Sequence, residues 1–276
     1  MKNILLFKLL VITIFFGCSN PKFNEYSSPI NQGISKERLH RIDSYLETKV
    51  NETVIPGAVA LVSRNGKIVY NKSFGHENPS ENIPYNNDHI FRIASMTKAV
   101  TSLATIMLWE EGNFLLDDPI EKYIPEFKEM TVLDEFNKSD TTYTTKKAKK
   151  KITIRHLLTH TSGIGYGFID NKESMRLIYD KAGITELYST ENITIEDVVK
   201  RLTQLPLHHD PGSDYVYSMG LDVLGYLIEI ISGLPLDQVF YDKIFEPLGM
   251  NDTYFYVPEE KHNRVVRVLI KKNNNW

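Results

Sequence analysis

The sequence predicts an α+β fold in which an antiparallel sheet packs with helices beside an all-helical lobe. Residues 58–63 and 67–74 are rich in strand-forming side chains, and Arg64-Asn65-Gly66 separates them. Asn-Gly tolerates the positive φ angles of a tight turn, so these two segments form an antiparallel hairpin. Residues 99–109 and 221–232 are almost continuously apolar and have the length of buried helices. A chain of 276 residues can bury a core of this kind.

The composition is that of an ordinary soluble globular domain. Hydrophobic residues make up 42% of the chain and charged residues 24%, and the formal net charge is −3. Nucleic-acid binding usually requires a basic excess, which this chain lacks, so nucleic acid is not an expected partner. Cys18 is the only cysteine. An exported chain of this kind has no internal disulfide, and its fold rests on packing.

Residues 1–18 have the layout of a secretory signal. Lys2 and Lys8 form a positive region, residues 9–16 are apolar, and the uncharged run is too short for a permanent membrane helix. The end, Phe15-Phe-Gly-Cys18, resembles the bacterial lipobox, in which the cysteine is acylated and becomes the mature N-terminus. We therefore expect export and a lipid anchor at Cys18 on a bacterial membrane, with the domain in the periplasm or at the cell surface. A plain cleaved signal or an uncleaved anchor is the alternative.

Residues 19–34 are rich in Ser, Asn and Pro and predict a linker, and residues 35–276 the folded domain. Ser35 is a suitable N-cap for a helix that extends to about Val50. Residues 134–151, with many Thr, Lys and Asp, predict a solvated insertion. Its lysines could touch anionic lipid, but a plain charged loop is the preferred interpretation.

Ser95 and Lys98 stand three residues apart at the start of the first apolar helix, which we expect to be central to the fold. This spacing places both side chains on nearly the same face. A lysine can activate a serine as a nucleophile if an apolar site or another cation lowers the lysine pKa. The backbone N–H of Ser95, at a helix start, could also donate to a developing oxyanion. Composition alone gives about one Ser-x-x-Lys match in such a chain, and a second occurs at Ser19 to Lys22.

Histidines offer two other chemistries. His156 and His160 are four residues apart and could share a metal, but the zinc-protease pattern needs Glu where Leu157 stands. No metal or cofactor is therefore expected. His208-His-Asp210 could serve a Ser-His-Asp relay, although a surface loop is the preferred interpretation.

A family resemblance appears when six blocks are considered together. They occur in order from about Pro56 to Pro258 and comprise residues 55–60 with the Asn-Gly hairpin, 91–98, 117–120, 154–163, 211–212 with 217–218, and 247–250. With these blocks the chain resembles the serine β-lactamase and penicillin-binding-protein superfamily, above all its class C β-lactamase, DD-peptidase and esterase branch. The resemblance implies a β-lactamase/DD-peptidase-like fold, with Ser95 as acylated nucleophile, Lys98 as its proton partner and Tyr217 as the tyrosine of the Tyr-x-Asn motif.

Two departures from the family pattern bear on activity. Met219 stands where Tyr-x-Asn has Asn, and a thioether cannot pair with a substrate amide, so residues 217–225 look more like the esterase branch. No Lys-Thr-Gly, His-x-Gly or Trp-x-Gly motif follows Tyr217; Lys181-Ala-Gly183 lies upstream and is interpreted as chance. We therefore expect a C-terminally truncated family member with an incomplete sheet. Loss of one oxyanion donor costs about 10²- to 10³-fold in rate.

These features lead to one main functional hypothesis and two alternatives. The main hypothesis is a lipid-anchored serine hydrolase that forms an acyl-enzyme at Ser95, either an esterase on small esters or a β-lactamase/DD-peptidase-like hydrolase. Its expected partners are a small-molecule ester or cell-wall-like acyl substrate and the membrane that holds the anchor. The alternatives are a catalytically silent domain that binds a ligand or partner, and a truncated inactive product.

Overall fold

The computed structural model describes residues 25–186, 192–273 and 276, and it divides into two compact units. One unit comprises the described residues up to Ile90 together with those from Asn263 onward, and the other comprises Phe91–His262. The predicted signal peptide 1–18, with Cys18, and the start of the linker lie outside the described residues. The mixed α and β content agrees with the predicted α+β fold.

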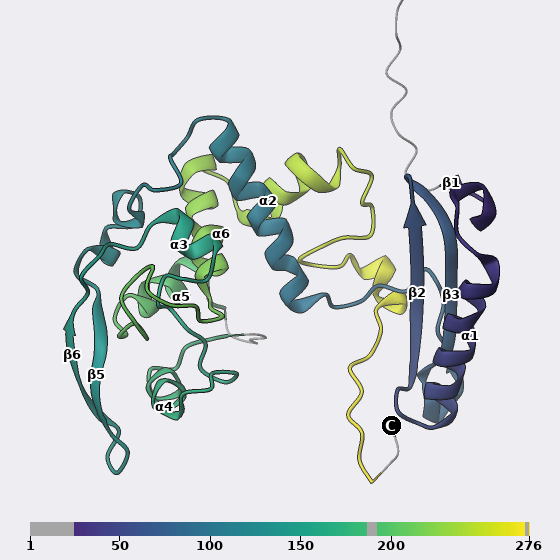
Figure 1. The fold of residues 1–276 in the computed structure, drawn as a ribbon, viewed down its shortest axis with the longest axis horizontal. Helices are drawn as coiled ribbons and strands as arrows, with labels where there is room; N and C mark the ends of the chain where they lie inside the picture. The colour runs from purple at the N-terminus through teal and green to yellow at the C-terminus, as the bar shows by residue number, and fades with distance from the viewer. Residues whose placement is uncertain (1–24, 187–191, 274–275) are drawn as a thin grey trace, which may run out of the picture. The chain divides into compact units, whose positions relative to one another are not determined.

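The first unit contains a small sheet covered by one helix (Figure 1). Its elements are β1 (Glu25–Tyr26), α1 (Lys36–Asn51), β2 (Gly57–Arg64), β3 (Lys67–Asn78) and β4 (Ile83–Pro84). The sheet order is β1-β3-β2, with β4 also on β3. β2 and β3 are antiparallel, and Asn65 and Gly66 turn the chain with φ of 52° and 71°, which confirms the predicted hairpin. β1 pairs in parallel with β3, so this part of the predicted linker belongs to the sheet.

α1 is fixed to β3 by a carboxylate that accepts hydrogen bonds from two side chains of β3. The Ser35 side chain caps the helix by accepting from the Arg38 N–H, as predicted. Asp43 accepts from the Tyr70 hydroxyl at 2.5 Å and from Lys72 Nζ at 2.7 Å. His40 Nδ1 lies 2.9 Å from the same carboxylate. These contacts, led by that of Lys72, lower the Asp43 pKa to about 2.

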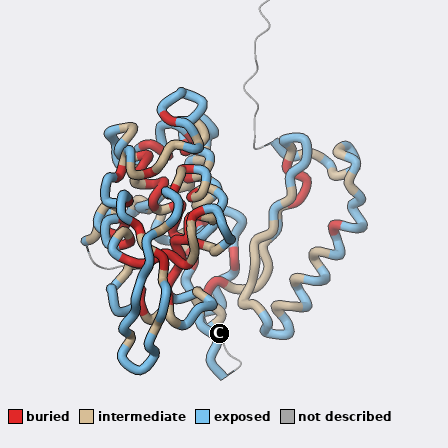
Figure 2. The backbone as a smooth tube through the Cα atoms, turned by 60° about the vertical axis from the view of Figure 1, so that its left-hand side comes forward, coloured by how far each residue is buried: buried red, intermediate tan, exposed pale blue. Residues whose placement is uncertain are grey.

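The second unit is mainly helical. Its helices and strands are α2 (Thr97–Glu110), β5 (Thr131–Asn137), β6 (Thr142–Lys147), α3 (Ile154–Leu158), α4 (Glu173–Lys181), α5 (Ile195–Leu202), α6 (Gly220–Ser232) and α7 (Leu236–Phe240), the last continued by a π-helical turn (Tyr241–Phe245). Figure 2 shows buried positions concentrated in its interior. α6 is central, because α2, α3, α5 and α7 all pack against it and Leu224, Leu227 and Ile228 have no exposed surface. The predicted helix at 221–232 is confirmed.

α2 differs from the prediction in how it is buried. Its buried positions form one stripe, made of Thr101, Ala104, Thr105 and Leu108. Leu103 and Trp109, on other faces, remain 46% and 40% exposed. The predicted helix is confirmed and packs against α6, but only one stripe of it is buried, although its sequence is apolar on nearly every face.

Among the described residues, no single helix is long and apolar enough to cross a membrane.

Residues 134–151 form most of an antiparallel hairpin, β5–β6, rather than a plain loop. β6 is exposed along its whole length, as a solvated insertion requires. Its β-branched threonines favour the extended backbone, and its lysines pair with nearby acids, such as Lys146 with Asp134 at 3.0 Å. The prediction of an all-helical lobe is wrong for this segment, since the mainly helical second unit also contains this β-hairpin.

Candidate active site

Ser95 lies on a strained turn that leads into α2. The turn is a 3₁₀ helix at Ala94–Met96. Ala94 has a φ of 42°, in the left-handed region that costs a non-glycine residue roughly 1–2 kcal/mol. Ser95 is exposed, and its backbone N–H makes no hydrogen bond with the described residues, whereas the Met96 N–H donates to Ile93 O at 2.9 Å. The N–H of Ser95 is thus available to an oxyanion, as predicted from the helix start.

Ser95 and Lys98 open onto the same cavity, which has a volume of about 210 Å³. The polar residues of its lining include Tyr166, Glu186 and Asp222. The apolar part of the lining includes Ile195, Leu221, Leu236 and Phe255. A cavity with a nucleophile, a cation and an apolar wall suits a small uncharged acyl group.

The Lys98 ammonium is held by two tyrosines. Nζ donates to the Tyr166 hydroxyl at 2.8 Å and lies 5.2 Å and 5.1 Å from the ring centroids of Tyr166 and Tyr217. Burial lowers the pKa of Lys98, but the hydrogen bonds to Tyr166 and Tyr217 and the charge of Asp222 together outweigh it, so the pKa is raised. The pKa lowering that would make Lys98 a free base is therefore absent. The residue is an ammonium at neutral pH.

The two tyrosines stack on each other, with ring centroids 5.5 Å apart and an interplanar angle of 17°. Tyr166 is only 4% exposed, and burial raises its pKa above the usual value, despite the opposing effect of Lys98. Tyr217 is half-buried and stands just before α6. The sequence predicted Tyr217 and missed Tyr166. The only feature of the sequence near Tyr166 that points to a role is its position three residues after the family block 154–163.

Asp222 was also missed by the sequence analysis. It lies in the first turn of α6 and faces the cavity. Burial raises its pKa to about 6, although the Lys98 ammonium opposes the shift. An acid at the start of the mostly apolar run 221–232, which also contains Glu229, is the signal that could have found it. Its negative charge helps to raise the pKa of Lys98.

His160 belongs to this site, and His156 does not. His160 Nδ1 accepts the Ser218 N–H at 3.2 Å and lies 2.9 Å from Ser218 Oγ, so the proton of the neutral ring is on Nε2. Its ring centroid lies 4.9 Å from that of Tyr217. Burial, and then Lys98, lower its pKa. His156 Nδ1 instead accepts the Thr153 N–H at the start of α3. No three metal-ligating side chains cluster within the described parts of the chain.

The turn at His208–Asp210 is partly buried, whereas the sequence predicted a surface loop. The side chains of His208 and Asp170 are 2% and 3% exposed, and His208 Nε2 lies 2.8 Å from Asp170 Oδ2. Asp210 accepts the Lys149 N–H at 2.7 Å instead. The surface-loop prediction is wrong for His208, and neither histidine of the turn lines the Ser95 cavity. The pairing could not be predicted from local sequence, because Asp170 precedes His208 by 38 residues.

The structure shows where the two departures from the family pattern lie, namely Met219 and the triplet Lys181 to Gly183. Met219 is 1% exposed, packs in the core, and donates its N–H to Gly165 O at 3.2 Å, so its side chain does not line the cavity. Lys181 ends α4, and its Nζ donates to Thr141 Oγ1 at 3.0 Å. Lys181 to Gly183 is therefore no substitute for a third motif at the site.

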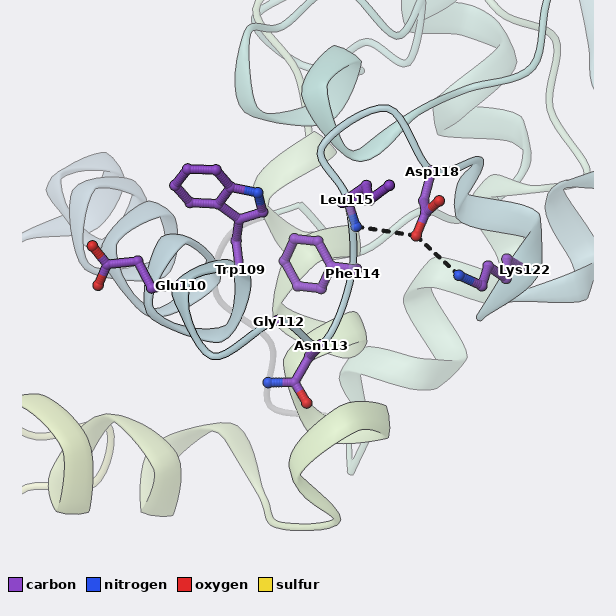
Figure 3. A pocket seen from close by; sticks show the side chains of 8 residues that line it. All are labelled: Trp109, Glu110, Gly112, Asn113, Phe114, Leu115, Asp118 and Lys122. Carbon is purple, nitrogen blue, oxygen red and sulfur yellow. Dashed lines mark hydrogen bonds and ion pairs between the residues drawn. The ribbon is translucent and has the colours of Figure 1, made fainter.

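A larger hollow of about 720 Å³ lies at the opposite end of α2 (Figure 3). Its wall includes Trp109 and Phe114. The Asp118 carboxylate there accepts from the Leu115 N–H at 3.1 Å and from Lys122 Nζ at 3.0 Å. These polar groups satisfy each other, and none of the Ser95 constellation is present. The smaller cavity is therefore the candidate active site.

Known proteins resemble this chain in sequence and in fold. The β-lactamase family model matches residues 42–275. The chain is 33% identical over 219 residues to esterase EstB of Burkholderia gladioli and 32% identical over 234 residues to monacolin J acid methylbutanoyltransferase of Aspergillus terreus. These matches cover 79% and 83% of the chain but 52% and 54% of the relatives. The solved structure of EstCE1, a hydrolase with promiscuous acyltransferase activity, matches with a TM-score of 0.70 and 28% identity, over 83% of this chain and 55% of EstCE1.

The chain thus spans about half the length of the curated relatives it matches. The matched region nevertheless includes nearly all described residues and the whole Ser95 cavity. The blocks that indicated the resemblance and the matching family model agree with each other. The chain belongs to the β-lactamase family.

Proposed function

We propose that this chain is a serine hydrolase that forms an acyl-enzyme at Ser95 and acts on small esters. The observation that carries the proposal is the cavity in which Ser95, the Lys98 ammonium and Tyr166 meet beside an apolar wall. The names of the relatives, an esterase and an acyltransferase among them, support the reaction class.

In the first step, Ser95 Oγ attacks the ester carbonyl carbon, and its proton passes to the oxygen of Tyr217, which reacts in this proposal as the phenolate. An ammonium favours the ionised form of an adjacent phenol, so Lys98 assists this transfer. The carbonyl oxygen becomes an oxyanion, to which the Ser95 N–H donates. The carbon–oxygen bond to the alcohol then breaks, and the alcohol leaves with the proton from Tyr217. In the second step water attacks the acyl carbon and gives a proton to the Tyr217 oxygen. The bond from that carbon to Ser95 Oγ breaks, Oγ takes the proton from Tyr217, and the acid and free Ser95 are released.

The division of roles follows from the surroundings of each group. The raised pKa of Lys98 makes it a stabilising cation rather than the group that takes the serine proton. The raised pKa of Tyr166 suits a neutral hydroxyl that accepts from Lys98. Tyr217 remains as the proton carrier.

Esters are preferred to amides in this proposal because of Met219. Its buried side chain leaves the cavity without the Asn amide that would pair with a peptide or β-lactam substrate. A second alcohol in place of water would turn the same acyl-enzyme into an acyl donor. EstCE1, described as a hydrolase with promiscuous acyltransferase activity, motivates this second candidate.

The test is intact-mass analysis of the full chain after incubation with a fluorophosphonate probe. Ser95 Oγ would displace fluoride from phosphorus and retain the phosphonyl group. We expect one adduct that maps to Ser95, is lost in Ser95→Ala and persists in Ser102→Ala, a matched serine two turns along α2. Hydrolysis of p-nitrophenyl acetate should follow the same pattern.

A folded chain that shows neither adduct nor turnover would contradict the proposal and favour a silent binding domain. An unfolded chain, by circular dichroism, would favour an inactive product. The proposed export and lipid anchor rest on residues 1–18 alone. Cys18→Ser should move the protein from the membrane fraction to the soluble fraction of a bacterial host, and an unchanged distribution would contradict the anchor.

A further inference from the structure

A buried ionisable pair lies directly behind Tyr166. His208 Nε2 and Asp170 Oδ2 are 2.8 Å apart, and both side chains are almost fully buried. Burial lowers the pKa of His208, and the Asp170 carboxylate offsets this only in part. Neither residue lines the Ser95 cavity, so the reaction proposed above does not use the pair.

The pair contacts the backbone next to Tyr166. A Cβ atom at Gly165 would lie 2.2 Å from His208 Nε2 and 2.9 Å from Asp170 Oδ2, so only glycine fits against these atoms. The Gly165 N–H donates to the Tyr179 hydroxyl at 3.1 Å, and Gly165 O accepts the Met219 N–H. The backbone before Tyr166 is thus fixed from three directions.

The backbone after Tyr166 is fixed as well. The Glu186 carboxylate accepts the N–H groups of Gly167 and Phe168, the latter at 2.8 Å. The Tyr166 hydroxyl, which accepts from Lys98, is thereby placed by contacts on both sides. Of these contacts, the buried pair has the largest free-energy cost of burial. Two ionisable groups removed from water rarely stabilise a fold more than apolar side chains of equal size.

We propose that the His208–Asp170 pair is a positioning element that holds Gly165 and Tyr166 so that the Tyr166 hydroxyl stays in hydrogen-bonding reach of Lys98. The proposal rests on the proposed acyl-enzyme chemistry for its kinetic consequence, but its geometric consequence is independent of activity. The pair acts through Tyr166 and does not touch substrate.

The kinetic test compares Asp170→Ala with the wild type, each with Tyr166 and with Tyr166→Phe. We expect Asp170→Ala to lower kcat for p-nitrophenyl acetate roughly 10-fold with little change in KM, because small displacements of catalytic groups are costly. In the Tyr166→Phe background the same replacement should change kcat less than about twofold. Asp210→Ala, an equal truncation at an acid that contacts the Lys149 backbone instead, is the matched control and should keep wild-type kcat.

The geometric test is a crystal structure of the variant. We expect the distance from Lys98 Nζ to the Tyr166 hydroxyl, 2.8 Å here, to exceed hydrogen-bonding range. If Asp170→Ala does not fold, the double variant His208→Leu/Asp170→Ala removes both ionisable groups and takes its place. Unchanged kcat, equal losses in both tyrosine backgrounds, or an unchanged distance would each overturn the proposal. If the wild type itself lacks turnover, the proposed function fails, and the distance alone still decides the role of the pair.

Discussion

The ammonium of Lys98 donates a 2.8 Å hydrogen bond to the hydroxyl of Tyr166. This bond ties the start of α2 to the loop that follows α3, 68 residues later in the chain. It also helps to raise the Lys98 pKa, so Lys98 is an ammonium, which has no lone pair to accept a proton from Ser95. We therefore propose different roles for the two tyrosines, in which Tyr166 accepts from Lys98 and Tyr217 carries the proton.

Replacement of the two tyrosines by phenylalanine should separate these roles. Tyr217→Phe should lower kcat about 10²- to 10⁴-fold, as expected for loss of a general acid–base group. Tyr166→Phe should lower kcat only about 10- to 100-fold, because Lys98 loses one hydrogen-bond partner but keeps Tyr217. Steady-state hydrolysis of p-nitrophenyl acetate measures both.

Tyr215→Phe serves as the control, because Tyr215 is exposed and precedes Tyr217 by two residues. It should retain wild-type kcat. A larger loss in Tyr166→Phe than in Tyr217→Phe would reverse the assignment.

Asp222→Asn should stabilise the fold at neutral pH. The Asp222 pKa is raised from 3.8 to about 6 by burial, so its ionisation opposes folding above that pH. Its contribution to stability is favourable below pH 4 and is lost as the pH rises through 6. Removal of the charge should raise the free energy of unfolding by roughly 1–3 kcal/mol at pH 7.5.

Urea unfolding at pH 7.5 and pH 4.5 checks this expectation, and the gain should shrink at the lower pH. A variant less stable than the wild type at pH 7.5 would show that the pairing with Lys98 outweighs burial. The same variant should lose activity, since Asp222 helps to keep Lys98 charged.

Gly225→Ala should narrow the apolar side of the cavity. A Cβ at this position of α6 would lie 2.8 Å from Ile195 Cδ1 and 3.0 Å from Leu236 Cδ2, and both residues line the cavity. These atoms end flexible side chains, so they can move at low cost. We expect roughly a 10-fold loss of kcat/KM for hexanoyl esters, equivalent to about 1.4 kcal/mol, with acetyl esters little affected.

The acetyl ester serves as the internal control in the same variant. A p-nitrophenyl ester series from two to eight carbons measures the change. An equal loss for all chain lengths would place the acyl group elsewhere, or would indicate a general disturbance of α6.

Asp43→Asn should weaken the attachment of α1 to β3. The pKa of Asp43, lowered to about 2 chiefly by Lys72 and then by Tyr70, means that its ionised form stabilises the fold. That contribution is present above pH 4 and is lost as the pH falls through 2. We expect the variant to lose about 1 kcal/mol at pH 7, a modest value because Lys72 is partly exposed.

Chemical denaturation at pH 7 measures this loss, and Glu47→Gln, an exposed acid on the same helix, is the matched control. An equal effect in both variants would indicate that helix charge, and not the Tyr70 and Lys72 contacts, is responsible.

Local chemistry in the sequence determined several elements by itself. Asn65-Gly66 has the φ freedom that a hairpin turn needs, and the mostly apolar run 221–232 had to be buried, so both predictions are confirmed. The three-residue spacing of Ser95 and Lys98 brought them to one cavity. These features depend on neighbours within a few residues. The six ordered sequence blocks, taken together, indicated the family.

The tertiary structure decided which other groups reach that cavity and what charge they carry. Tyr166 and Asp222 come from segments about 70 and 125 positions beyond Lys98, and no local period marks either one. The His208–Asp170 pair likewise joins two loops across the core. The pKa direction of Lys98 depended on these distant partners, because burial alone would have lowered it, and the hydrogen bonds to the tyrosines together with the charge of Asp222 raise it.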